Sequence, residues 1–142
     1  MNLVRTGPPE APRVILPNGT GSVSASWWSL VRALDGTYEF VLLDYPGVGE
    51  SESRRFSSVE EVAGMAAPDC MRLRRRRFGI VGFSFGSLIA QHLALEARRD
   101  VRNRVLMGAS AHIYPRGVET IGTWLELLER MGLETVLNRW RC

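Results

Sequence analysis

A serine between two glycines is the residue whose setting points most clearly to chemistry. Ser84 lies at the centre of residues 82–86, which read GFSFG. An apolar run precedes this pentapeptide and a helical pattern follows it, so we expect a tight strand-to-helix turn. Glycine suits both flanks of such a turn, because a side chain there would collide with the neighbouring strand or helix. The turn would raise the Ser84 hydroxyl above the strand ends, where it can act as a nucleophile.

The backbone that follows this serine favours negative charge. Phe85 is expected to begin the helix, and the first N–H groups of a helix have no partner within it. The free amide and the helix dipole together attract an anion. The spacing therefore predicts a nucleophile beside a place where negative charge is stabilised.

Alternating strands and helices are expected to position Ser84. Apolar runs separated by amphipathic segments are typical of a parallel sheet with helices on both faces. We therefore predict an α/β fold with a mainly parallel sheet and a short edge strand at residues 3–5. The strands are expected at residues 13–16, 38–43, 78–83 and 104–108, and the helices at residues 24–34, 57–77 and 84–98, with two further helices near the C-terminus.

Two details of the helices can be predicted from individual residues. Ser22 or Ser24 is placed to cap the first helix, since serine oxygens accept hydrogen bonds from the free N–H groups of a helix start. The second helix contains Gly64 and Pro68. Because both residues disfavour a helix interior, we expect this helix to be interrupted near them.

Length, composition and charge narrow the possible functions. The chain has 142 residues, of which 45% are apolar and 23% charged, as expected of one globular domain. All 18 basic residues are arginine and the net charge is only +3, so we expect no nucleic-acid partner.

Cys70 and Cys142 have no paired spacing, so no disulfide framework, metal or cofactor is expected. With no apolar run of about 20 residues and no signal-peptide pattern, we expect no membrane partner and a cytoplasmic location.

Three motifs in register resemble the α/β-hydrolase superfamily. Residues 16–27 (LPNGTGSVSASW) are similar to its oxyanion loop, residues 44–51 (DYPGVGES) to the turn after the next strand, and residues 82–86 to its nucleophile elbow. The resemblance covers residues 13–110. It implies a core at residues 1–110 that is truncated after about the sixth strand, and the start of a helical cap at residues 111–142.

The resemblance implies roles for four residues. Ser84 would be the nucleophile of a serine hydrolase. The oxyanion hole would be formed by the N–H of Phe85 together with an N–H of Gly19 or Thr20. The family usually has His-Gly where this chain has Asn18 and Gly19. Since the loop works through backbone N–H groups, we expect the oxyanion hole to survive this difference.

The general base is harder to assign, because in this family the triad acid and histidine follow the serine at a distance. His92 and His112 are the two histidines of the chain. His92 lies about 12 Å along the helix from Ser84, at 1.5 Å per residue, and is expected to be a packed histidine facing away. His112 follows the predicted strand at residues 104–108, so it is a candidate base, with a loop histidine at the cap entrance as the alternative.

No carboxylate is clearly placed to orient either histidine. Asp44 ends a predicted strand, and the proline and glycine after it favour a role in forming the turn. Glu50 and Glu52 follow in the same loop and are expected to be solvated charges. The triad acid and histidine are therefore expected to be missing from this chain, which leaves open whether it is an enzyme.

Three functions follow from these expectations. The first is a hydrolase that acts on a carboxylic ester, thioester or lactone, with a small acyl compound as substrate. The second is a truncated, non-catalytic relative that binds a small acyl ligand or a partner, and the third is an acyltransferase of the same fold. Because the later strands of the family are expected to be missing, the strand at residues 104–108 is expected to be an open apolar edge through which the chain can self-associate.

Overall fold

The computed structural model describes residues 1–72 and 77–110, together with residues 119, 123, 126, 130 and 131. The chain divides into two compact units, Met1–Ala109 and Ser110–Cys142. The strands that the structure describes all belong to the first unit. The two helices expected near the C-terminus fall almost wholly outside the described residues.

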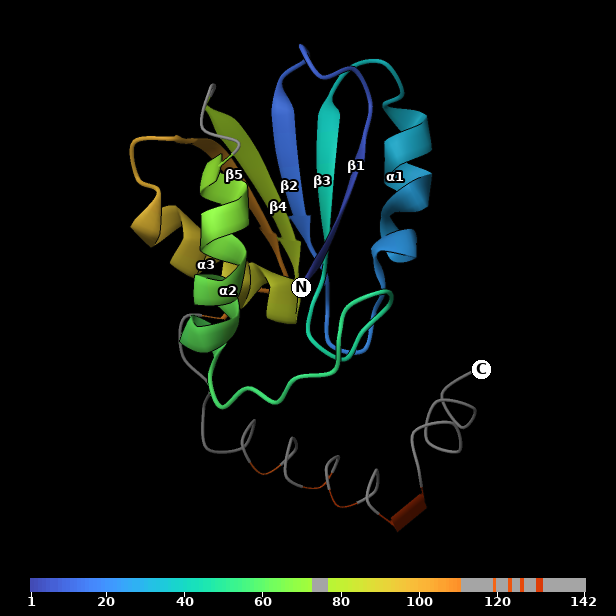
Figure 1. Cartoon of the computed structure of the whole chain (residues 1–142), viewed down its shortest axis with the longest axis vertical. Helices are drawn as coiled ribbons and strands as arrows, with labels where there is room; N and C mark the ends of the chain where they lie inside the picture. Colours follow the sequence, from blue (N-terminus) through green and yellow to red (C-terminus); the bar gives the residue numbers. More distant parts are fainter. Residues whose placement is uncertain (73–76, 111–118, 120–122, 124–125, 127–129, 132–142) are drawn as a thin grey trace. The chain divides into compact units, whose positions relative to one another are not determined.

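A five-stranded sheet forms the centre of the first unit (Figure 1). Its strand order is β1-β3-β2-β4-β5. The edge strand β1 runs antiparallel to β3, whereas β2 is parallel to β3 and β4, and β4 is parallel to β5. The predicted α/β fold with a mainly parallel sheet is therefore confirmed. The strands are β1 (Asn2–Thr6), β2 (Arg13–Pro17), β3 (Glu39–Asp44), β4 (Phe78–Phe83) and β5 (Val101–Met107).

Helices cover both faces of this sheet, as Figure 1 shows. On one face a short 3-10 helix (Ser24–Trp27) leads into α1 (Trp28–Ala33), and on the other lie α2 (Val59–Arg72) and α3 (Phe85–Glu96). Strand β3 supplies both cores because its side chains alternate between the two faces. Phe40 and Leu42 pack with Trp27 and Val31. The opposite core contains Val41, Leu43, Val62, Ala66, Ile80, Ile89 and Leu93.

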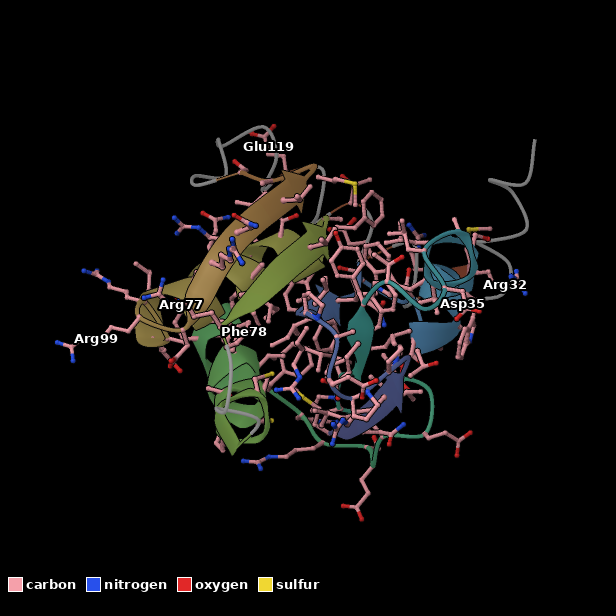
Figure 2. The ribbon with its side chains drawn as sticks, turned by 90° about the horizontal axis from the view of Figure 1, so that it is seen from above. Arg32, Asp35, Arg77, Phe78, Arg99 and Glu119 are labelled. Carbon is pink, nitrogen blue, oxygen red and sulfur yellow. The ribbon has the colours of Figure 1, made fainter. Side chains whose placement is uncertain are left out.

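Exposed charged residues lie on both sides of the sheet. Arg32 and Asp35 are exposed at the C-terminal end of α1, on the periphery in Figure 2. On the other side of the sheet Arg77 and Arg99 are also exposed, whereas the neighbouring Phe78 is buried.

In the part of the chain that the structure describes, no helix is both long enough and apolar enough to cross a bilayer.

Helix α2 differs from its prediction, because it continues through Gly64 and Pro68 without interruption. Both residues are exposed and lie four positions apart, on one side of the helix. Pro68 cannot donate a hydrogen bond to the carbonyl of Gly64, but water can satisfy that carbonyl on an exposed surface. The buried side of α2, which includes Val62 and Ala66, packs into the core and holds the helix together.

Strand β5 begins at Val101, three residues earlier than predicted. This start could not be predicted from the sequence, because Arg102, Asn103 and Arg104 are exposed and show no apolar alternation. The apolar end of the strand is also exposed, with Val105 half accessible to solvent. Among the described strands β5 pairs only with β4, so it forms an edge of the sheet.

Candidate active site

Ser84 lies between the end of β4 and the start of α3 in a strained backbone conformation. Its φ and ψ angles are 52° and −119°, and it is the one non-glycine residue at positive φ in the described part of the chain. Such a conformation costs about 1–3 kcal/mol and persists only when the surrounding structure enforces it. The Ser84 N–H donates to the carbonyl of Met107 at 2.8 Å, and the Ser84 carbonyl accepts from the N–H of Ser87 at 2.8 Å. The Ser84 side chain is exposed.

The two glycines that flank Ser84 are required by close backbone contacts. A Cβ atom on Gly82 would lie 2.5 Å from the carbonyl oxygen of Gly86. A Cβ atom on Gly86 would lie 2.2 Å from the carbonyl oxygen of Pro17, at the end of β2. Both distances are far shorter than a carbon–oxygen contact allows, and backbone atoms cannot rotate away. The collisions predicted from the spacing of the glycines are therefore present.

Ser87 fastens the start of α3 to the ends of two strands. Its hydroxyl is fully buried and lies 2.8 Å from the carbonyl oxygen of Gly82 and 2.9 Å from that of Met107. The role of Ser87 was not predicted from the sequence. One signal was available: this serine lies on the side of the helix that otherwise carries apolar residues. Because a buried hydroxyl needs a hydrogen-bond partner, that position indicates such a bond.

The glycine-rich loop after β2 is held by three hydrogen bonds. The Nδ2 of Asn18 donates to the carbonyl of Leu43 at 2.8 Å, and the hydroxyl of Tyr45 donates to the carbonyl of Asn18 at 3.0 Å. The N–H of Ser22 donates to the carbonyl of Gly19 at 3.2 Å. Gly19 is buried and Thr20 is exposed. Asn18, which stands where the family usually has histidine, therefore anchors the loop through its side chain.

A pocket of about 290 Å³ adjoins both the loop and the elbow. Trp27, Phe83 and Met107 form its apolar walls, and the side chain of Phe83 is half exposed. Two buried polar atoms of the lining residues, Oδ1 of Asn18 and Nε1 of Trp27, have no hydrogen-bond partner among the described residues. The complete lining consists of Asn18, Gly19, Ser22, Ser26, Trp27, Phe83 and Met107.

Asp44 is buried, and its carboxylate binds Asn2 and Ser24. Its carboxylate accepts a hydrogen bond from the backbone N–H of Ser24 at 2.7 Å and from Nδ2 of Asn2 at 3.2 Å. The hydroxyl of Ser24 lies 3.3 Å from the same carboxylate. Neither Ser22 nor Ser24 caps a helix through its side chain, because the 3-10 helix follows Val23. The predicted serine cap is wrong, since Asp44 binds Ser24 instead.

The other ionisable candidates are two glutamates and two histidines. Glu50 and Glu52 are exposed in the loop after β3. His92 is partly buried on α3, with its Nε2 3.4 Å from Oε1 of Glu60 on α2. His112 lies outside the described residues. The structure brings Gly19 of the loop against Phe83 of the elbow, and it places His92 beside Glu60 instead.

Three glycine-containing motifs, the strained serine and the sheet order define a class of fold, and sequence comparison identifies it. Residues 12–133 match the model of the α/β hydrolase fold family. The chain belongs to this family, as the resemblance of its motifs predicted.

Individual relatives agree with this assignment. The chain is 28% identical over 131 residues to RutD of Agrobacterium fabrum, whose name describes a carbamate hydrolase, covering 91% of this chain and 50% of that protein. It is 30% identical over 101 residues to the pimeloyl-[acyl-carrier protein] methyl ester esterase of Vibrio atlanticus, covering 71% of this chain and 38% of the esterase. The chain thus spans about half the length, or less, of these curated relatives.

A solved structure shows the same fold. An esterase from Thermogutta terrifontis superposes with a TM-score of 0.82 at 21% identity, over 98% of this chain and 52% of that chain. At this level of identity the likeness shows the fold alone.

Proposed function

We propose that this chain contributes the nucleophile and oxyanion hole for hydrolysis of a carboxylic ester, thioester or lactone. The backbone of Ser84, held at a φ of 52° between β4 and α3, is the observation that carries the proposal. A non-glycine residue keeps this strain only where its surroundings enforce it, and strained positions cluster at functional sites. The relatives named for carbamate and methyl ester hydrolysis support acyl compounds as the substrate class.

The chemistry would begin at the Ser84 hydroxyl. Its oxygen attacks the acyl carbon while a base accepts the hydroxyl proton, and the former carbonyl oxygen becomes an oxyanion. The N–H of Phe85 and an N–H of Gly19 or Thr20 donate to this oxyanion. Each donor of this kind contributes about 2.7–4 kcal/mol to catalysis. The alcohol or thiol then leaves, and water releases the acyl group from Ser84.

A base must accept the proton of the Ser84 hydroxyl. His112 is the candidate that the sequence offers, and its place lies outside the described residues. His92 has a carboxylate partner on α2, which favours a packing role. Because the described residues bring no histidine to Ser84, the second candidate function is a non-catalytic relative that binds a small acyl ligand. A cytoplasmic location and the absence of nucleic-acid and membrane partners stay predictions.

A fluorophosphonate probe with an intact-mass readout separates the two functions. We expect one adduct on the wild-type chain and none on Ser84→Ala. The matched control is Ser29→Ala, which removes an exposed serine from α1 and should label like the wild type. Turnover of a p-nitrophenyl ester, lost in Ser84→Ala, would exclude the non-catalytic function. A native chain with neither labelling nor turnover would refute hydrolysis by this chain.

A further inference from the structure

Tyr45 touches both segments of the proposed oxyanion hole. It follows β3 and is 3% exposed, so its side chain lies within the fold. Its hydroxyl donates to the carbonyl of Asn18 at 3.0 Å. Its ring meets the ring of Phe85 edge-on, with the centroids 5.5 Å apart and the planes at 89°. One buried side chain therefore connects the loop after β2 to the first residue of α3.

The hydrogen bond from Tyr45 fixes the direction of a backbone amide. A trans peptide is planar, so its carbonyl and N–H point in opposite directions. Holding the carbonyl of Asn18 toward Tyr45 therefore directs the N–H of Gly19 away from Tyr45. The next peptide is held in turn, because the carbonyl of Gly19 accepts from Ser22 at 3.2 Å. The N–H groups of Gly19 and Thr20 are thus oriented before any substrate binds.

The same bond strengthens the N–H of Gly19 as a donor. A carbonyl that accepts a hydrogen bond polarises its peptide, which makes the N–H of that peptide a better donor. Tyr45 can only assist in this way if its hydroxyl keeps its proton. Burial raises the pKa of Tyr45 above its usual range, so the hydroxyl remains a donor wherever ester hydrolysis is measured.

We propose that Tyr45 is the positioning residue of the oxyanion hole. Its hydroxyl aligns the loop through the carbonyl of Asn18, and its ring packs against Phe85 at the start of α3. The inference rests on the proposed function of Ser84. Tyr45 does not contact the reacting atoms, and it acts through the peptide of Asn18 and Gly19. Its loss should therefore slow the chemical step and leave binding of the acyl compound unchanged.

Tyr45→Phe tests the role of the hydroxyl, because the ring and its contact with Phe85 are kept. The control is Tyr38→Phe, which removes a tyrosine hydroxyl beside Phe40 in the other core. Fluorophosphonate labelling of Ser84 is followed at several probe concentrations, under conditions where both variants keep the wild-type circular dichroism. We expect the maximal labelling rate of Tyr45→Phe to fall about 10–100-fold, because small misplacements of reacting groups slow a reaction by factors of this size. The probe concentration giving half that rate should not change.

A wild-type labelling rate in Tyr45→Phe would overturn the inference, and so would an equal loss in Tyr38→Phe. If the wild-type chain is not labelled at Ser84, the proposed function fails, and a second measurement decides the role of Tyr45. The amide nitrogen shift of Gly19 in an NMR spectrum reports the hydrogen bond at the carbonyl of Asn18. A shift in Tyr45→Phe but not in Tyr38→Phe supports the positioning contact, and unchanged spectra refute it.

Discussion

Replacing Gly86 by alanine tests the packing that fixes the elbow. The new Cβ atom would lie 2.2 Å from the carbonyl oxygen of Pro17 and 2.6 Å from that of Asn18. An ordinary carbon–oxygen contact is more than 1 Å longer, so α3 must move away from the end of β2. Overpacking of this kind costs about 1–3 kcal/mol when side chains can adjust. Because both atoms here are backbone, we expect a loss of about 3 kcal/mol or more.

A second glycine supplies the matched control for this change. Gly64 also lies inside a helix, but a Cβ atom there would meet nothing within 4 Å. Gly64→Ala should stabilise the protein by about 0.5–1 kcal/mol, because alanine loses less conformational entropy in a helix. Both variants are compared with the wild type by urea denaturation. The melting temperature of Gly86→Ala should be roughly 10 °C below that of the wild type, because 1 kcal/mol corresponds to about 3–5 °C for a chain of this size.

The outcome separates packing from propensity. If Gly86→Ala is as stable as Gly64→Ala, the reasoning is refuted, because helix propensity alone would then explain the stability of both variants. The displaced loop should also lower Ser84 labelling by more than the lost stability explains. Wild-type labelling in a folded Gly86→Ala variant would show that the loop and the elbow are not coupled.

Three further predictions concern stability and association. Glu39 is buried and binds Arg5 and Arg13, so Glu39→Gln should cost about 1.5–3 kcal/mol at pH 7 in denaturant titrations, because a neutral amide replaces the carboxylate that both cations bind. Burial raises the pKa of Glu39, but hydrogen bonds and charges from the two arginines outweigh it and hold the pKa below its ordinary value. The difference between wild type and Glu39→Gln should therefore persist above about pH 4.5 and shrink as the pH falls through the lowered pKa, as titrations at several pH values would show. Ser87→Ala should cost about 1–3 kcal/mol in denaturant titrations, since it removes the hydroxyl between the ends of β4 and β5. Leu106→Arg should reduce concentration-dependent association in sedimentation experiments if the exposed edge at β5 mediates it, and unchanged association would exclude that edge.

The elbow could be predicted because its sequence signals are local, although distant residues such as Pro17 and Met107 help to hold it. Two glycines at fixed distances from Ser84, an apolar run and a helical pattern all lie within a few residues of one another. Residues 38–43 likewise predicted a strand, and β3 (Glu39–Asp44) forms there. The family follows from three such local motifs.

Features that depend on distant contacts escaped prediction. Asp44 binds Ser24, twenty residues earlier, and this contact replaced the predicted serine cap. The hydroxyl of Tyr45 reaches Asn18 across a similar separation, and no periodicity reveals such a pair. Propensity predicted an interruption of the helix near Gly64 and Pro68, whereas packing of the opposite side of α2 keeps it continuous.

The central claim is that the fold makes Ser84 a nucleophile. Peptide mapping after fluorophosphonate treatment tests this most directly, with the native chain and a urea-unfolded sample treated in parallel. We predict a single adduct on the Ser84 peptide of the native chain and none on the unfolded chain. An adduct on another residue, or equal labelling of the native and unfolded chains, would contradict the claim.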